Sequence, residues 1–459
     1  DVSAATVKNS NAKIHLVAID KDYEALTYSI VSEPINGTAS LSGNKVTYTP
    51  NTDYTGTDSF TFKASDTGDD SEIKTVSIKI INSYSSSAMK TWEINGEASG
   101  DQSGYSLSFN EDATIMAVGA RYADGNYGFN SGHVRVFQFS NDSWSQLGSD
   151  IDGEAANDYF GRSVSLSSDG MTLAIGSSDN DGYRTNSGHV RIYQFSNDSW
   201  SQLGADIDGK FNNDRLGQSV SLSSDGNTVA IGAYGNDSNG SDSGHVKVYN
   251  YNGTWTQLGA DINGEAANDY SGMSVSLSSD GTTMAIGAYN NDGNGTNSGH
   301  VRIYNYNGTS WSQLGSDIDG EAAGDELGRS VSLSSDGNTV AIGANNNDGN
   351  GTNSGHVRVY NYNETTWTQL GEDIDGETAN DQSGYSVSLS SDGNTVAIGT
   401  YNNYSTVYNY DGTSWSHLGS DIDGEAANDN GAVSLSSDGT TLAIGAYGND
   451  DNGSNSGHV

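Results

Sequence analysis

The chain has no cysteine and two prolines among its 459 residues. The absence of cysteine excludes disulfide bonds and thiolate-ligated zinc. Apolar residues make up 33% of the sequence, which is below the ~45–50% of ordinary globular domains. No stretch approaches the ~20 consecutive apolar residues of a membrane helix. We therefore expect a protein that is not embedded in a membrane.

Positive charge is also scarce. The chain carries 19 Lys and Arg against 59 Asp and Glu, which gives a net charge of −40. Such a surface repels phosphate groups, so we expect no nucleic-acid partner. The acidity is consistent with two explanations: solubility in a saline environment and attraction of divalent cations. Gly (59 residues) and small polar residues fill the apolar deficit, as many short strands joined by tight turns require.

What is abundant is a repeated motif. Its core reads G-x-S-V-S-L-S-S-D-G-x-T-x-A-I-G, and a polar loop, S-G-H-V-R-V-Y and a Trp follow. A period of this length is the signature of a propeller, a solenoid or an array. The tryptophans that we take to mark the phase are spaced by 52, 56, 55, 56, 56 and 48 residues: Trp92, Trp144, Trp200, Trp255, Trp311, Trp367 and Trp415.

One repeat predicts four short antiparallel strands, at residues 163–166, 172–175, 189–193 and 200–203. Four such strands form one propeller blade, and blades must stack to bury both faces. We predict an all-β fold with a seven-bladed propeller over residues 92–459, whose last repeat is truncated at Val459. Residues 88–94 match a fourth strand that would complete the last blade. An open array with more repeats is the alternative.

Residues 1–82 do not carry the repeat. They alternate apolar and polar residues, as in 59–64 and 76–80, with turn clusters between the runs, which predicts a β-sandwich. The segment resembles the cadherin-like and Ig-like tandem modules of bacterial surface proteins, through Asn36-Gly-Thr-Ala-Ser-Leu41 and Asp53-Tyr-Thr-Gly-Thr-Asp-Ser-Phe-Thr-Phe62. Residues 83–91 are expected to be a linker.

The repeat itself resembles the FG-GAP repeat of integrin α-chain propellers. The resemblance rests on Asp158-Tyr-Phe-Gly-Arg-Ser-Val164, Leu173-Ala-Ile-Gly176 and Gly188-His-Val-Arg-Ile-Tyr193. It implies a propeller used for extracellular recognition. One repeat alone keeps Phe-Gly, at Phe160-Gly161. The family's calcium hairpin is reduced to Ser-Ser-Asp-Gly, so its calcium role does not transfer to that turn.

A second polar loop offers oxygen ligands at alternating positions around glycine turns, which suits Ca²⁺. A full calcium loop has more carboxylates, so we expect at most weak structural binding, with a Kd of ~10⁻⁴–10⁻³ M. The alternative is a turn whose Asn and Asp side chains bond their own backbone. The candidate ligands are Asp237, Asn239, Asp292, Asn294, Asp348 and Asn350.

Two further sets of polar residues recur in nearly every repeat: a histidine at the expected start of the third strand, and an acidic loop such as Asp150-Ile-Asp-Gly-Glu154 followed by Asp158. An active site needs one unlike constellation, so symmetric repetition argues against catalysis. We predict that the histidines pack or form hydrogen bonds and that the aspartates cap backbone N–H groups. No catalytic residue and no enzymatic activity are expected. The histidines are His133, His189, His245, His300, His356 and His458.

A unique partner surface is expected where the repeat symmetry breaks. The sixth repeat lacks Ser-Gly-His, and one inter-repeat loop is atypical. The candidate residues are Tyr401, Asn402, Asn403, Tyr404, Lys210, Phe211 and Arg215.

These observations favour an extracellular adhesion, recognition or scaffold fragment of a larger bacterial surface protein. Its partner would be a cell-surface glycan or protein, further modules of its own parent chain, or another copy. A multivalent lectin, with several equivalent sugar sites, is one alternative. A polysaccharide-active enzyme is another, and it requires an acid–base cluster that the sequence does not display.

Overall fold

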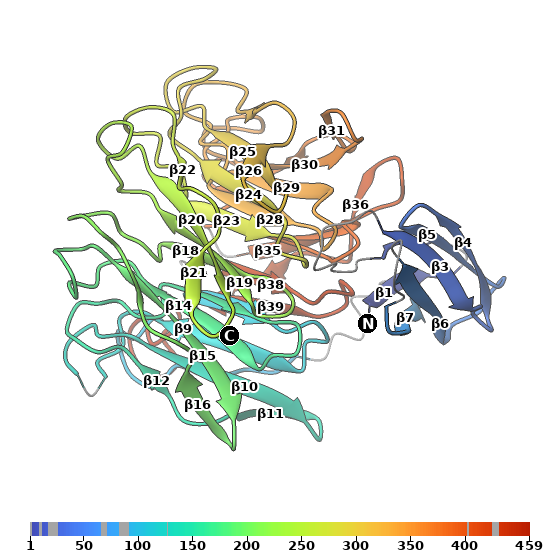
Figure 1. Cartoon of the computed structure of the whole chain (residues 1–459), viewed down its shortest axis with the longest axis horizontal. Helices are drawn as coiled ribbons and strands as arrows, with labels where there is room; N and C mark the ends of the chain where they lie inside the picture. Colours follow the sequence, from blue (N-terminus) through green and yellow to red (C-terminus); the bar gives the residue numbers. More distant parts are fainter. Residues whose placement is uncertain are drawn as a thin grey trace.

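The computed structural model describes residues 2–8, 12–16, 26–65, 71–81, 91–125, 127–401, 404–424 and 431–459. Within these ranges all regular secondary structure is β-strand, as the composition predicts. Figure 1 shows the first strands, in blue, as a group beside the repeated sheets that follow. The domain boundaries at residues 82 and 92 remain predictions.

The N-terminal region is a sandwich of two sheets, and its Ig-like character is as predicted. One sheet has the order β1-β7-β6-β3 and the other β2-β5-β4. Leu16, Tyr48, Phe60 and Val76 are fully buried between them. The strands are β1 Val2–Val7, β2 Ala12–His15, β3 Thr27–Ser32, β4 Gly37–Ser42, β5 Lys45–Pro50, β6 Gly56–Ser65 and β7 Lys74–Ile81.

The repeat region consists of small antiparallel sheets that fit a propeller. Six sheets have four strands in sequence order, and a two-residue strand pairs with the third of them. The sequence does not indicate this short fifth strand. The innermost strands are β8 Ser106–Phe109, β13 Ser163–Leu166, β18 Ser219–Leu222, β23 Ser274–Leu277, β28 Ser330–Leu333, β33 Ser386–Leu389 and β38 Gly431–Leu435.

The other strands lie progressively farther from the centre. The second strands are β9 Ile115–Ala120, β14 Thr172–Ser177, β19 Thr228–Ala233, β24 Thr283–Ala288, β29 Thr339–Ala344, β34 Thr395–Gly399 and β39 Leu442–Ala446. The third strands are β10 His133–Ser140, β15 His189–Ser196, β20 His245–Tyr251, β25 His300–Tyr306, β30 His356–Tyr362 and β35 Tyr404–Tyr410.

The outer strands are β11 Ser143–Gln146, β16 Ser199–Gln202, β21 Trp255–Gln257, β26 Trp311–Gln313, β31 Trp367–Gln369 and β36 Trp415–His417. The two-residue strands are β12 Ile151–Asp152, β17 Ile207–Asp208, β22 Ile262–Asn263, β27 Ile318–Asp319, β32 Ile374–Asp375 and β37 Ile422–Asp423.

The innermost strands are joined into a closed ring by the second serine of the Ser-Val-Ser-Leu motif. In each repeat this hydroxyl accepts a hydrogen bond from a backbone N–H of the next inner strand. Seven such bonds, of 2.9–3.2 Å, run around the ring. The last, from Phe109 to Ser434, joins the first repeat to the final one.

The final sheet has two strands in the described residues, β38 and β39. Ile94 and Val459 exchange two backbone hydrogen bonds, of 2.8 and 3.0 Å, and Asn95 bridges His458. Six sheets are therefore complete and a seventh is partial, so the count of seven full blades remains a prediction.

This pairing corrects one expectation. Residues 91–94 do not form a fourth strand, and residues 88–90 lie outside the described ranges. Ile94-Asn95 instead occupies the place that the two-residue strand Ile151–Asp152 has in the first sheet. Trp92 is thus out of phase with the other tryptophans, because it precedes this position by two residues whereas Trp144 precedes it by seven.

The hydrophobic core lies between neighbouring sheets. One cluster combines Val134 and Ile151 of the first sheet with Leu173 and Ile175 of the second, and further clusters repeat the pattern. Five tryptophans pack at these junctions. Each indole N–H donates to a leucine carbonyl of the preceding sheet at 2.7–3.0 Å, for Trp200, Trp255, Trp311, Trp367 and Trp415.

Candidate functional site

The least regular position of the repeat lies in G-x-S, immediately before each innermost strand. The flanking residues are fixed by packing. Gly217 has a left-handed φ of 91°, and a Cβ there would lie 2.6 Å from the carbonyl oxygen of His189. Ser163 Oγ donates to the Gly217 carbonyl at 2.9 Å. The middle position is free to vary, and it holds Tyr105, Arg162, Gln218, Met273, Arg329, Tyr385 and Ala432.

These side chains gather with others at one end of the ring of inner strands. We call the assembly the aromatic–arginine cluster. It comprises Tyr105, Arg121, Tyr122, Tyr159, Arg162, Arg215, Tyr234, Tyr270, Tyr289, Arg329, Tyr385, Tyr401 and Tyr447. Twelve of the thirteen are half-buried and Tyr401 is exposed, so the cluster is held in place yet open to solvent.

One arc of the cluster is centred on Tyr105. The Arg121 guanidinium carbon lies 3.6 Å from the centroid of the Tyr105 ring and 4.6 Å from that of Tyr122. Tyr447 also packs against Tyr105, with ring centroids 5.3 Å apart. Arg162 donates hydrogen bonds to the Tyr105 hydroxyl and to Gln218 Oε1. Cation–π contacts of this kind orient the guanidinium without neutralising it.

The second arc runs from Arg215 to Tyr401. Arg215 donates to the Tyr234 hydroxyl, and the rings of Tyr234, Tyr270 and Tyr289 follow one another at 5.6 Å centroid spacing. The Arg329 guanidinium carbon lies 5.3 Å from the Tyr289 ring and 5.5 Å from the Tyr385 ring.

The cluster concentrates positive charge in an acidic protein. It holds four arginines, in a chain with 19 basic residues. Asp179 faces one of them, with an Oδ1 that lies 3.6 Å from Arg215. Burial raises the pKa of Tyr234 and of Tyr289, so both phenols are neutral hydrogen-bonding groups at neutral pH. Aromatic faces beside guanidinium groups suit a flat polar ligand that carries negative charge.

The partner surface predicted from the sequence is divided by the structure. Arg215 and Tyr401 belong to the aromatic–arginine cluster, the latter through a 5.6 Å contact with Tyr385. The backbone N–H groups of Lys210 and Phe211 donate hydrogen bonds to the carboxylate of Asp214, which caps this turn. Asn402 and Asn403 lie outside the described residues.

Tyr404, the remaining predicted residue, donates to Asp381 at 2.8 Å. It pairs with Asp423 on β37 as His189 pairs with Asp208 on β17. Tyr404 therefore replaces the repeated histidine of its sheet. Four other cluster residues, Tyr105, Arg162, Arg329 and Tyr385, occupy one irregular position inside a regular motif, whereas the sequence prediction rests on whole irregular loops.

The predicted calcium loops form turns that use their own side chains. Oδ1 of Asp237, Asp292 and Asp348 each accepts a backbone N–H from the residue five places later, at 2.8 Å. Nδ2 of Asn239, Asn294 and Asn350 each donates to a glycine carbonyl at 2.7–3.0 Å. One carboxylate oxygen per loop is thus already engaged. These hydrogen bonds are those of a turn that satisfies its own backbone. Calcium binding at these loops remains a prediction.

Five of the repeated histidines start the third strands, as predicted, and are buried, whereas His458 is half-buried and lies outside the named strands. Four of them lie in groups with a Glu and an Asp whose ligand atoms are within 4.8 Å of one another, for example Glu154, His189 and Asp206. Arg191 bonds both Glu154 and Asp206 in that group. The guanidinium supplies the positive charge that a metal ion would bring, so the geometry is that of an ion-pair network that is partly exposed to solvent.

The electrostatics of the histidines follow from burial. Burial, followed by the adjacent Arg191, lowers the pKa of His189 to about 4. Burial, followed by the adjacent Lys247, lowers the pKa of His245 to about 4. Burial, followed by the adjacent Arg302, lowers the pKa of His300 to about 4. These imidazoles are therefore neutral at physiological pH.

The inter-repeat aspartates cap backbone N–H groups, as predicted. Asp158 accepts hydrogen bonds from the backbone N–H of Ala155 at 3.0 Å and from Asn180 Nδ2 at 2.9 Å. Burial raises its pKa to about 6. Equivalent caps at Asp101, Asp269 and Asp325 use the same backbone position.

The fold defines an all-β protein in which propeller-type sheets follow an Ig-like sandwich. Residues 1–79 match the bacterial Ig domain family. Residues 151–193, 207–249, 263–304 and 318–360 match the FG-GAP repeat family. The chain therefore joins a bacterial Ig domain to FG-GAP repeats, as the sequence resemblance indicates.

Comparison with curated proteins finds no match. Among solved structures, a Bacteroides uniformis protein provisionally described as a 6-phosphogluconolactonase is similar, with a TM-score of 0.50 and 11% identity. The match covers 74% of this chain and 88% of that chain. At this identity the likeness concerns the fold alone.

Proposed function

We propose that this chain is an extracellular recognition module whose repeat region binds an acidic polysaccharide at the aromatic–arginine cluster. FG-GAP repeats and bacterial Ig domains are typical of surface or adhesion-type proteins, and such domains are typically non-enzymatic. Among the described residues there is no helix long and apolar enough to span a bilayer. An extracellular or surface location accords with both domain families.

The observation that carries the proposal is the grouping of four arginines with tyrosine rings. Sugar rings present flat C–H faces that pack on aromatic side chains, and guanidinium groups bind carboxylates in a bidentate manner. A uronic acid offers both features. The net charge of −40 repels polyanions, so binding of such a ligand requires a local positive site.

The cluster also favours one ligand site over the multivalent lectin alternative. The side chain at the middle of G-x-S, which supplies part of the cluster, differs from repeat to repeat: it is Tyr105, Arg162, Gln218, Met273 and Arg329 in the first five repeats. A lectin with equivalent sites would place the same side chains in each repeat. We therefore expect one oligosaccharide per chain.

Calorimetric titration with galacturonate oligosaccharides tests the proposal, with neutral dextran oligosaccharides of equal length for comparison. Arg329→Gln should weaken binding by about tenfold to a hundredfold, as loss of a charge-assisted hydrogen bond does. Arg184→Gln removes the same charge from an exposed loop outside the cluster and should leave the affinity unchanged.

Three results would overturn the assignment. Absence of galacturonate binding removes the acidic polysaccharide. Equal losses in the two arginine variants place the site elsewhere. A stoichiometry of several ligands per chain favours the multivalent lectin.

A further inference from the structure

At the opposite end of the inner strands, the Ser-Ser-Asp-Gly turns form a second ring. In six of the seven turns a backbone N–H donates to a carbonyl of the next turn, through bonds of 2.9–3.1 Å that run from Glu111 through Ser168, Ser224, Ser279, Ser335 and Ser391 to Ser437. The positions of these side chains are thus set by main-chain bonds and not by loop conformation.

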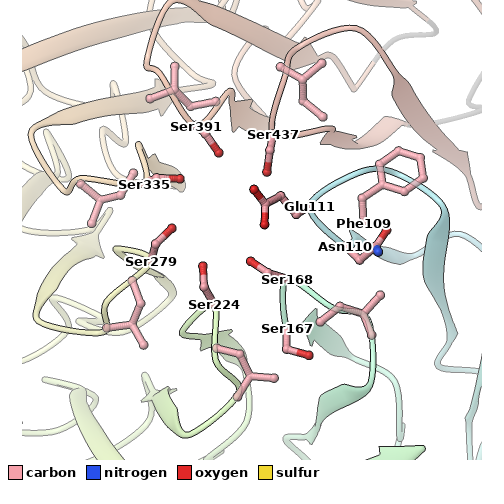
Figure 2. Close-up of a pocket in the computed structure, with 16 residues that line it drawn as sticks. Phe109, Asn110, Glu111, Ser167, Ser168, Ser224, Ser279, Ser335, Ser391 and Ser437 are labelled. Atoms are coloured by element: carbon pink, nitrogen blue, oxygen red, sulfur yellow. The ribbon is translucent and has the colours of Figure 1, made fainter. Parts of the chain in front are cut away.

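The ring encloses a cavity of about 150 Å³. Figure 2 shows the hydroxyls of six serines and the carboxylate of Glu111 directed toward its centre. Leucines from the ends of the inner strands, such as Leu166 and Leu222, complete the wall. Six of the seven turn positions are therefore identical, and the seventh replaces a hydroxyl with a carboxylate.

The substitution gives the cavity one negative charge. Among its sixteen described lining residues, Glu111 is the one charged side chain, and no Lys, Arg or His accompanies it. Burial raises the pKa of Glu111, because the ionised form loses hydration. A carboxylate held in a ring of hydroxyl oxygens forms an oxygen-only donor set, which selects hard cations and disfavours zinc and copper.

The dimensions suit a cation that keeps part of its water shell. Hydrogen-bonded backbones lie about 4.8 Å apart, so seven turns on a circle place the backbone about 5.5 Å from the axis. At about 30 Å³ per water, the cavity volume corresponds to roughly five water molecules. An ion on the axis of this circle is too far from the seven turns for all of them to bind it directly at the 2.3–2.6 Å typical of Ca²⁺. Some of the turns would therefore contact the ion through bridging water.

We propose that this axial cavity binds one partly hydrated divalent cation, Ca²⁺ or Mg²⁺, through the Glu111 carboxylate and the surrounding serine hydroxyls. The site is separate from the Asn/Asp loops and from the aromatic–arginine cluster. With one carboxylate, the affinity belongs in the weak range of extracellular calcium modules, with a Kd of ~10⁻⁴–10⁻³ M. The cation would join the turns of all the inner strands at one point.

The test uses the full chain and the variant Glu111→Ser, which makes the seven turn positions identical and so preserves the ring. Crystals soaked in SrCl₂ should show one anomalous peak on the axis beside Glu111 in the wild type and none in the variant. In solution, equilibrium dialysis against CaCl₂ should give one bound ion fewer per chain for the variant. An axial peak that persists in Glu111→Ser, or no axial peak in the wild type, would overturn the proposal.

Two controls separate this site from others. Glu372→Gln removes one charge from an exposed position and should leave the axial peak and the ion count unchanged. Asp292→Asn alters a candidate calcium loop, and it should leave the axial peak in place whether or not that loop binds an ion. Loss of the axial peak in either control would show that the peak reports overall acidity and would refute a specific role of Glu111.

Discussion

Acid should destabilise this fold through its buried histidines, and His300 allows the effect to be isolated. Its side chain is 2% exposed, and its Nδ1 lies 3.7 Å from Asp317. Burial and the neighbouring Arg302 lower its pKa from 6.5 to about 4. The folded state therefore binds fewer protons at this imidazole than the unfolded state does. The resulting stabilisation is complete above pH 6.5 and is lost as the pH falls toward 4.

The magnitude follows from the two pKa values. Between pH 7 and pH 5 a histidine with folded and unfolded values of about 4 and 6.5 loses about 2 kcal/mol of unfolding free energy. In His300→Gln this loss disappears. The stability difference between wild type and variant should therefore shrink by about 2 kcal/mol on going from pH 7 to pH 5. This double difference cancels the titration of all groups that the two proteins share.

Urea unfolding followed by tryptophan fluorescence and by circular dichroism measures these free energies, and coincident transitions verify two-state behaviour. Val301→Ala deletes buried apolar volume on the same strand and should cost the same at both pH values. His189→Gln, two repeats away, should act additively with His300→Gln. A stability difference for His300→Gln that stays constant to within about 0.5 kcal/mol would refute the assigned pKa and with it the reasoning from burial.

Two further substitutions test the inter-sheet contacts. Asp269→Ala removes a buried cap that accepts hydrogen bonds from the Ala266 N–H at 2.8 Å and from Asn291 Nδ2 at 3.2 Å. Leaving these donors unpaired should lower the unfolding free energy by about 2–4 kcal/mol. Asp269→Asn keeps one acceptor and should show a smaller loss on denaturation. Trp311→Phe keeps most of the packing but loses the 3.0 Å hydrogen bond to the Leu258 carbonyl, so we expect the unfolding free energy to decrease by about 1 kcal/mol. No measurable decrease would show that this hydrogen bond makes no net contribution to stability.

Much of the fold is readable from the sequence because the repeat fixes both strand period and turn chemistry. Ser163–Leu166 and Thr172–Ser177 coincide with expected strands to within two residues. The predicted starting position of the first repeat is wrong because Trp92, unlike the other tryptophans, does not lie on an outer strand. The acidic motif Glu93-Ile94-Asn95-Gly96-Glu97, which matches Asp150-Ile-Asp-Gly-Glu154, was the better marker, since its position is set by pairing with the third strand.

The candidate sites were less predictable. Neither the aromatic–arginine cluster nor the axial cavity is contiguous in sequence, because each takes one to three residues from every repeat. Tyr105 and Tyr447 are more than 300 residues apart, and their ring centroids lie 5.3 Å from each other. Glu111 replaces the serine that the other repeats have at the same position. The direction of its side chain toward the axis depends on the handedness and closure of the ring. Pattern analysis of single repeats does not contain that information.

The hydrogen bond between Phe109 and Ser434 has a consequence for how the ring comes apart. In an open array, stability is a sum of units and nearest-neighbour interfaces, so unfolding can begin at a free end where one interface is broken. A closed ring offers no such end. Detaching any one sheet requires both of its junctions to break together, which favours slow, all-or-none unfolding and long survival of the folded state in surroundings without chaperones.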